Sequence, residues 1–176
     1  MDDLMQSIVG ELSGAPKAQL SSQLGADSRT TENAVQAALP MLLGALAKNS
    51  ASTGGADALA GALDRDHDGS ILDYLVGFLG GGGSGGQGGD GAAILGHILG
   101  TRETAVEAGI GKATGLQSGQ AAQLLQMLAP IVLGYLGRQK RQQSMSAGVL
   151  GELLGTQSSR AQAQNPALGA LASLLD

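Results

Sequence analysis

The chain has 176 residues, of which 43% are hydrophobic, and this length suffices to bury a core without covalent cross-links. It contains no cysteine, which excludes a disulfide framework and thiol chemistry. Its aromatic residues are Tyr74, Phe78 and Tyr135, a composition that argues against a β-sandwich and favours closely packed helices. Charged residues make up 14% of the chain, against about 25% in an average soluble domain. A surface so poor in charge suggests that part of it is covered by a partner.

Apolar residues recur at helical spacing along the chain, which predicts an all-α protein. In the first half we expect helices over about residues 2–12, 17–24, 28–48, 56–63 and 70–79. The apolar face of the first helix consists of Leu4, Met5, Ile8, Val9 and Leu12. Gly25 is a typical C-terminal glycine for the second helix, and Ser28 is the predicted N-cap of the third.

The fifth predicted helix begins with an S-x-x-D pattern, Ser70 and Asp73, which is typical of a capping box. Its predicted apolar residues are Ile71, Leu72, Leu75, Val76 and Leu79.

The third predicted helix contains a proline, Pro40, and a glycine four residues later, Gly44. A proline inside a helix removes a hydrogen bond and clashes with the preceding turn, at a cost of about 3 kcal/mol. We therefore expect either two helices joined at Pro40 or a kink there. Because Gly44 lies on the same face, the pattern predicts a close crossing with another segment. A hinge or ligand groove opened by the freed carbonyls is the alternative.

An acidic segment follows the fourth predicted helix and resembles the start of a calcium-binding loop, D-x-D-x-D-G. Alternating carboxylates in such a loop can converge on one cation. The usual bidentate Glu at the twelfth position is missing, because Leu75 stands there. One interpretation is a polar turn whose acids favour the N-terminus of the next helix. The other is a cation site, with calcium at millimolar affinity at best, formed by Asp64, Asp66, Asp68 and Asp73.

The chain has two histidines, His67 and His97. His67 stands among the acidic residues and would fit a transition-metal site, but a site with one histidine and no cysteine is a weak match. His97 lies in an apolar segment, and we expect it to be a packing histidine that is hydrogen-bonded to a carbonyl.

Residues 80–91 are nearly all glycine, and glycine loses more backbone entropy on ordering than any other residue. The segment therefore predicts a flexible tether. It divides the chain into a first helical repeat over 1–79, a linker over 80–91 and a second helical repeat over 92–176.

Shifting the sequence by 90 residues aligns the two halves without a gap. Pro40 then meets Pro130, and Gly44 meets Gly134. We interpret this as an internal duplication of a unit of about five helices, packed as one pseudo-symmetric domain because each copy alone is small. The last helix of the second copy is predicted to start at Asn165-Pro166.

Three segments carry a resemblance to a known family: ALPMLLGALA, GADALAGALDRDHDGSILDYLVGFLGGG and GAAILGHILG. Over about residues 35–100 the chain resembles the YidB-like family of bacterial proteins, a family of unknown function. The resemblance implies an all-helical fold with an internal duplication, and it implies no activity.

Neither an export signal nor a membrane span is evident. The N-terminus is acidic, whereas a signal peptide begins with basic residues. The longest uncharged run is densely apolar only over 127–136, about half of the roughly 20 residues that a span requires. We therefore expect a cytoplasmic protein.

Charge differs between the halves: residues 1–90 carry a net −7 and residues 91–176 a net +2. The basic residues of the second half gather at Arg138, Lys140 and Arg141, where cations suit the C-terminus of a long helix. They are too few, and lack the neighbouring aromatics, to indicate nucleic-acid binding.

The sequence predicts no enzyme and no cofactor. A G-x-S-x-G match at 82–86 lies inside the glycine run, without the preceding strand that a nucleophile elbow requires. The leading hypothesis is a non-enzymatic helical interaction or scaffold module that self-associates or binds a protein partner through apolar helix faces. The first alternative is a cation- or small-ligand-binding protein that uses the loop from Asp64 to Asp73. The second is a peripheral membrane protein whose amphipathic helices lie on lipid.

Overall fold

The computed structural model describes residues 4–81 and 91–164, and these residues are helical with no strand among them. The elements are α1 (Leu4–Glu11), α2 (Ala15–Leu24), α3 (Ser28–Ser50), α4 (Gly55–Arg65), the 3₁₀ helix η1 (Ser70–Tyr74), α5 (Leu75–Gly80), α6 (Gly91–Leu99), the 3₁₀ helix η2 (Gly100–Arg102), α7 (Glu103–Thr114), α8 (Ser118–Gln142) and α9 (Ala147–Gln164). The all-α prediction is confirmed. The helix predicted after Asn165-Pro166 and most of the glycine-rich tether, residues 82–90, lie outside the described residues.

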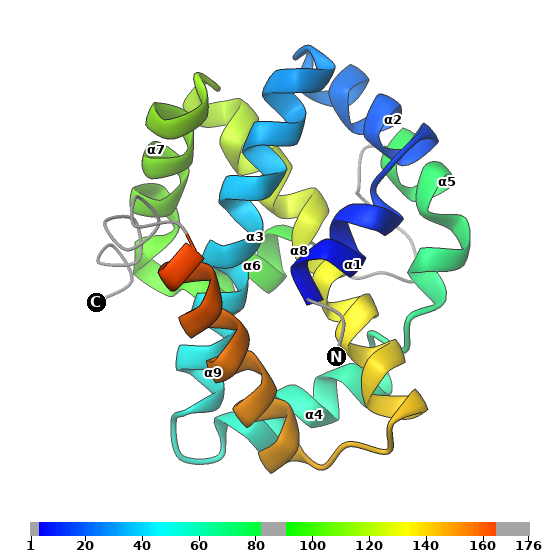
Figure 1. The fold of residues 1–176 in the computed structure, drawn as a ribbon, viewed down its shortest axis with the longest axis vertical. Coiled ribbons are helices and arrows are strands. Elements are labelled where there is room, and N and C mark those ends of the chain that lie inside the picture. The colour runs from blue at the N-terminus through cyan, green and yellow to red at the C-terminus, as the bar shows by residue number, and fades with distance from the viewer. Residues whose placement is uncertain (1–3, 82–90, 165–176) are drawn as a thin grey trace.

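The two long helices, α3 and α8, contact each other at the centre of the molecule, and the other helices surround them (Figure 1). Helices from the two halves of the sequence are interleaved, because α7 and α9 pack on α3 while α2 and α4 pack on α8. The buried apolar residues form one continuous cluster with members from both halves. The halves therefore share a single core.

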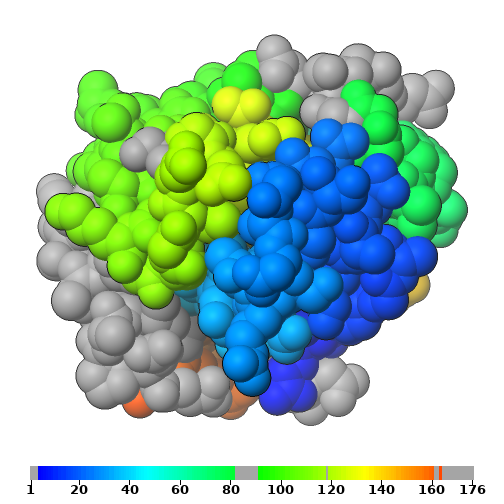
Figure 2. Space-filling view, turned by 90° about the horizontal axis from the view of Figure 1, so that it is seen from above, coloured from blue at the N-terminus to red at the C-terminus, as the bar shows by residue number. Residues whose placement is uncertain are grey.

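The two halves also meet near the start of the long helices. In Figure 2 the blue residues of the N-terminal segment lie directly against the yellow-green residues of α7 and the first turns of α8. There the Gln120 side chain of α8 donates a hydrogen bond of 2.7 Å to the carbonyl of Leu24, the last residue of α2. This bond ties the end of an N-terminal helix to the beginning of α8.

Both long helices continue through their prolines. Pro40 lies inside α3 and Pro130 inside α8, so the alternative of two separate helices joined at Pro40 is wrong. Both prolines are buried, as are most of the residues around them. Burial of these central turns on several sides offsets the roughly 3 kcal/mol that an internal proline costs, because tertiary packing supplies most helical stability.

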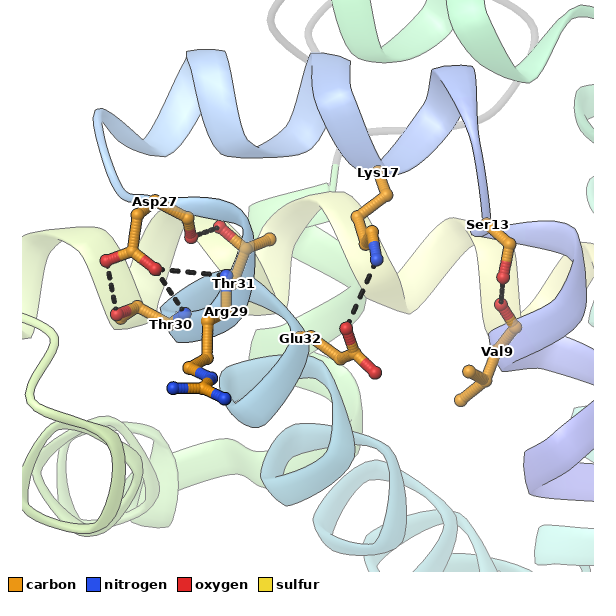
Figure 3. A network of polar contacts seen from close by, with 8 residues as sticks. All are labelled: Val9, Ser13, Lys17, Asp27, Arg29, Thr30, Thr31 and Glu32. Carbon is orange, nitrogen blue, oxygen red and sulfur yellow. Dashed lines mark hydrogen bonds and ion pairs between the residues drawn. The ribbon is translucent and has the colours of Figure 1, made fainter.

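The N-cap of α3 is Asp27, not Ser28 as predicted. The Asp27 carboxylate accepts hydrogen bonds from the backbone N–H of Arg29 at 3.0 Å and of Thr30 at 2.9 Å (Figure 3). Hydrogen bonds from Thr30, first from its backbone and then from its hydroxyl, hold the pKa of Asp27 below its usual value. A carboxylate oxygen reaches these N–H groups, so Ser28 becomes the first helical residue. The prediction for Gly25 is confirmed, since it ends α2 with a left-handed φ of 61°.

The capping box predicted from Ser70 and Asp73 is wrong. Ser70 is the first residue of η1, and its backbone N–H bonds to the Asp68 carboxylate at 3.0 Å, while Asp73 bonds to a residue of α8. Because residues 70–74 form a 3₁₀ helix of about three residues per turn, the following residues are rotated out of the expected α-helical phase. Val76, predicted on the apolar face, is 46% exposed as a result.

The turn from 66 to 71 lies directly on the C-terminal half of α8. A close crossing of the kind predicted for Gly44 occurs at its counterpart in the second half, Gly134, where a Cβ would come within 2.5 Å of Ile71 Cγ2. One turn further along α8, a Cβ on Gly137 would fall on the backbone carbonyl of His67. Two glycines on one face of α8 therefore allow the turn to approach at backbone distance.

Gly137→Ala should destabilise the fold, by about 1–3 kcal/mol, because the added methyl group displaces the His67 carbonyl and the turn that carries it. Urea unfolding monitored by circular dichroism measures this change.

The matched control is Gly119→Ala in the same helix, where a Cβ meets nothing within 4 Å. Alanine is the better helix former, so this variant should be as stable as the parent or more stable by up to about 1 kcal/mol. Equal effects of the two substitutions would contradict the close approach at Gly137.

Candidate functional site

The acidic residues after α4 face the basic C-terminal end of α8. Lys140 Nζ donates to both carboxylate oxygens of Asp64 at 2.7 Å, and the lysine side chain is 14% exposed. Arg138 Nη2 donates to Asp73 Oδ1 at 2.8 Å. Residues that stand 76 and 65 positions apart in the sequence therefore neutralise each other.

Asp68 combines an ion pair with a cap. Its Oδ2 lies 3.6 Å from Arg141 Nη1, and its Oδ1 accepts from the Ser70 backbone N–H. This N–H group and the Ser70 hydroxyl are the main reasons why the pKa of Asp68 is lowered, and Arg141 adds to the effect. We call the three pairs the ionic clasp: Asp64–Lys140, Asp68–Arg141 and Asp73–Arg138.

The clasp bears directly on the predicted cation site. Three of its four predicted ligands, Asp64, Asp68 and Asp73, pair with basic side chains, and Asp66 is the C-cap residue of α4. Among the residues that the structure describes, no group of three His, Asp or Glu side chains could hold a metal ion. Lysine and arginine side chains already supply positive charge to these carboxylates. Cation binding at the four residues stays a prediction.

The two histidines have different surroundings. The His67 side chain is buried, with 8% exposed, and its backbone carbonyl contacts Gly137. Burial lowers the pKa of the His67 imidazole from its ordinary value of 6.5, while the Asp66 carboxylate acts in the opposite direction. His97 is exposed, so the prediction of a packing histidine is wrong there. The inward positions of α6 are occupied by Leu95 and Leu99 instead.

A second candidate site, which sequence reasoning missed, is a groove between α3, α4, α6 and α8. It encloses about 360 Å³, within the range of about 300–1,000 Å³ that is typical of small-ligand pockets. Most of its lining is apolar: Leu46, Ala58, Leu59, Ile94, Ile98 and Leu133. Its polar lining residues are Asn49, Arg65 and His97. We call this space the apolar groove.

A smaller pocket of about 210 Å³ adjoins the apolar groove, since Asn49 and Ile98 line both. Between α3 and α6, the Asn49 amide donates to the His97 carbonyl at 3.3 Å. Its other lining residues are the polar Lys48, Ser52 and Arg102 and the apolar Ala45 and Leu99. We call it the polar pocket. No single segment carries these residues, so only the packed helices reveal the site.

These features define the class of the protein: an all-α domain with an apolar groove between its helices. The chain belongs to the family described as bacterial proteins of unknown function (DUF937), whose model matches residues 6–139. The family resemblance expected from the sequence is thereby confirmed. No curated protein and no solved structure matches the chain. In the described ranges, none of the helices has the length and apolar character needed to cross a membrane.

If the clasp provides the positive charge at the acidic turn, calcium should not raise the melting temperature of the wild-type protein below millimolar concentration. Thermal melts with and without calcium measure this effect.

In a double-mutant cycle, Asp64→Asn and Lys140→Gln should show a coupling of about 0.5 kcal/mol in the free energy of unfolding, since one partner is half exposed. The coupling should weaken in high salt. Thermal melts of the single and double variants at low and high salt measure the coupling.

The control for calcium is Asp66→Asn, because Asp66 lies outside the clasp. It should leave the melting temperature nearly unchanged in either condition. Stabilisation by micromolar calcium that Asp66→Asn abolishes would instead make the turn a cation site.

His67 predicts a pH dependence of stability. The unfolded chain binds a proton at this imidazole near pH 6.5, whereas the folded chain binds it only at lower pH. The stability due to neutral His67 is therefore fully present above pH 6.5 and decreases as the pH falls toward the folded-state pKa. His67→Gln should reduce the slope of unfolding free energy against pH just below 6.5. An unchanged slope in this variant would contradict the assignment to His67.

Proposed function

We propose that this protein is a non-enzymatic helical binding module that holds the apolar chain of a small amphiphile in the apolar groove. The observation that carries the proposal is the groove itself, about 360 Å³ in volume and lined mainly by leucine, isoleucine and alanine. Sites between packed helices with an apolar lining and a few polar groups are typical of small-molecule binding.

The apolar residues that line the groove include a buried set and a partly buried set. Leu46 of α3 and Leu133 of α8 are buried members of the central core, so their positions are set by packing. Leu59, Ile94 and Ile98 are only partly buried, and they cover the groove from α4 and α6. A ligand chain that enters the groove would bury their remaining apolar surface, which is favourable by about 25 cal/mol per Å².

The distribution of exposed apolar residues favours small-ligand binding in the groove over self-association through a broad apolar face. Among the described residues, the large hydrophobic side chains that are exposed are Tyr74, Val76 and Val149, and they do not include any groove residue. Self-association, a protein partner, contact with a membrane surface and a cytoplasmic location stay predictions from the sequence.

We also propose that the fold arose by internal duplication. Its support is that α3 and α8 begin at Ser28 and Ser118, 90 residues apart, and that each contains a buried proline at the same offset. The preceding helices end at Gly25 and Gly115, both with left-handed φ.

Ligand uptake can be measured with a neutral fluorescent probe for apolar sites, N-phenyl-1-naphthylamine. The wild-type protein should give a saturable rise in fluorescence. Ala58→Phe should weaken binding at least about tenfold, because Ala58 lines the groove from an exposed position and a phenyl ring there fills it.

The control is Ala93→Phe, which adds the same ring at an exposed position of α6 that does not line the groove. Its probe affinity should equal that of the wild type. Absence of saturable binding, or equal losses in both variants, would refute the proposed site.

A further inference from the structure

We infer that the ligand of the apolar groove carries an anionic head group, and that the guanidinium of Arg102 binds this head in the polar pocket. The inference rests on the proposed function and specifies its ligand class: a single-chain carboxylate, with its tail in the groove and its carboxylate at Arg102.

Charge around the two pockets favours an anion. Among the residues that the structure describes, the charged residues that line them are Arg65, Lys48 and Arg102, all basic, and none is acidic. This is unusual on a chain whose net charge is −5. A cleft lined by one sign of charge attracts ligands of the opposite sign.

Arg102 differs from the basic residues of α8. Arg138, Lys140 and Arg141 pair with carboxylates in the ionic clasp. Within the part of the chain that the structure describes, Arg102 makes no ion pair and its guanidinium has no hydrogen-bond partner. Its planar array of donors fits a carboxylate in bidentate fashion, which makes a short, charge-assisted pair.

The other polar groups of the polar pocket are already engaged. The Asn49 amide donates to the His97 carbonyl, and the Ser52 hydroxyl donates to the Asn49 carbonyl at 2.6 Å. One of the two Asn49 amide hydrogens and the Ser52 hydroxyl hydrogen are therefore used inside the protein. Recognition of an anion in this pocket depends on Arg102, with Lys48 adding positive charge to the lining.

The volumes of the two pockets favour a ligand with one apolar tail. The apolar groove lies near the lower end of the volume range of small-ligand pockets, and the polar pocket adjoins it at Asn49 and Ile98. A molecule with one apolar tail and a head at one end matches an apolar space beside a basic one. We therefore choose a free fatty acid over a two-chain lipid.

The test is displacement of bound N-phenyl-1-naphthylamine by three ligands with the same tail, below the concentrations at which they form micelles: decanoate, decanol and decyltrimethylammonium. Decanoate should displace the probe most effectively. Arg102→Gln should weaken decanoate at least about tenfold and leave decanol unchanged, since only the charged head meets the guanidinium. Arg29→Gln is the control, because Arg29 is an exposed arginine of α3 that makes no ion pair with a described residue and lines neither pocket.

Three results would overturn the inference. If the probe binds but decanoate is no better than decanol, the groove takes neutral ligands, and the proposed function stands without this head group. If Arg102→Gln weakens decanol equally, its effect is structural. If the protein binds vesicles of anionic phospholipid while decanoate does not displace the probe, the basic lining recognises a membrane surface. Failure of the probe itself to bind would count against the proposed function instead.

Discussion

The crossing of α3 and α8 is the contact on which the other helices depend. A chain with three aromatic residues has to build its core from leucine, isoleucine, valine, methionine and alanine, which pack well only when helices approach closely. The two long helices provide such a centre, and residues such as Leu39, Leu43, Leu128 and Leu136 are fully or almost fully buried in it. Because helices of both halves cover this centre, neither half has a core of its own. The internal prolines are tolerated for the same reason.

The C-terminal half of α8 sets the position of the acidic turn. Gly134 and Gly137 bring the turn to backbone distance, and the basic residues that follow are then within reach of its carboxylates. The turn thus gains its counter-charges from the protein. An acidic loop that resembles a cation site can be held by a helix end instead, and the glycine face of α8 is what makes the ion pairs geometrically feasible.

Local features of the fold could be predicted from the sequence, whereas features that depend on distant residues could not. The helices and the end of α2 at Gly25 follow from periodicity and glycine chemistry, which act over a few residues. The sequence pattern predicts the N-cap of α3 one residue late, because Asp27 and Ser28 are both good caps and only the backbone geometry distinguishes them. The sequence contains both partners of each pair in the clasp, but locally each partner is equally well explained by a helix dipole. Their pairing spans at least 65 residues. The groove draws on four helices and has no local signal.

The clasp and the groove together suggest how the charge of this protein is divided between stability and binding. The chain is acidic, yet its bases are not spread evenly: those of α8 are used in the clasp, where they offset the excess of acid in the first half. Arg65 and Arg102 instead line pockets in which none of the described lining residues is acidic. An unpaired guanidinium next to an apolar cavity loses hydration when a ligand covers it, unless the ligand provides an anion. An arginine in this position, such as Arg102, therefore disfavours a neutral head group and favours a carboxylate. The apolar lining contributes affinity in either case, so selectivity depends on the charge.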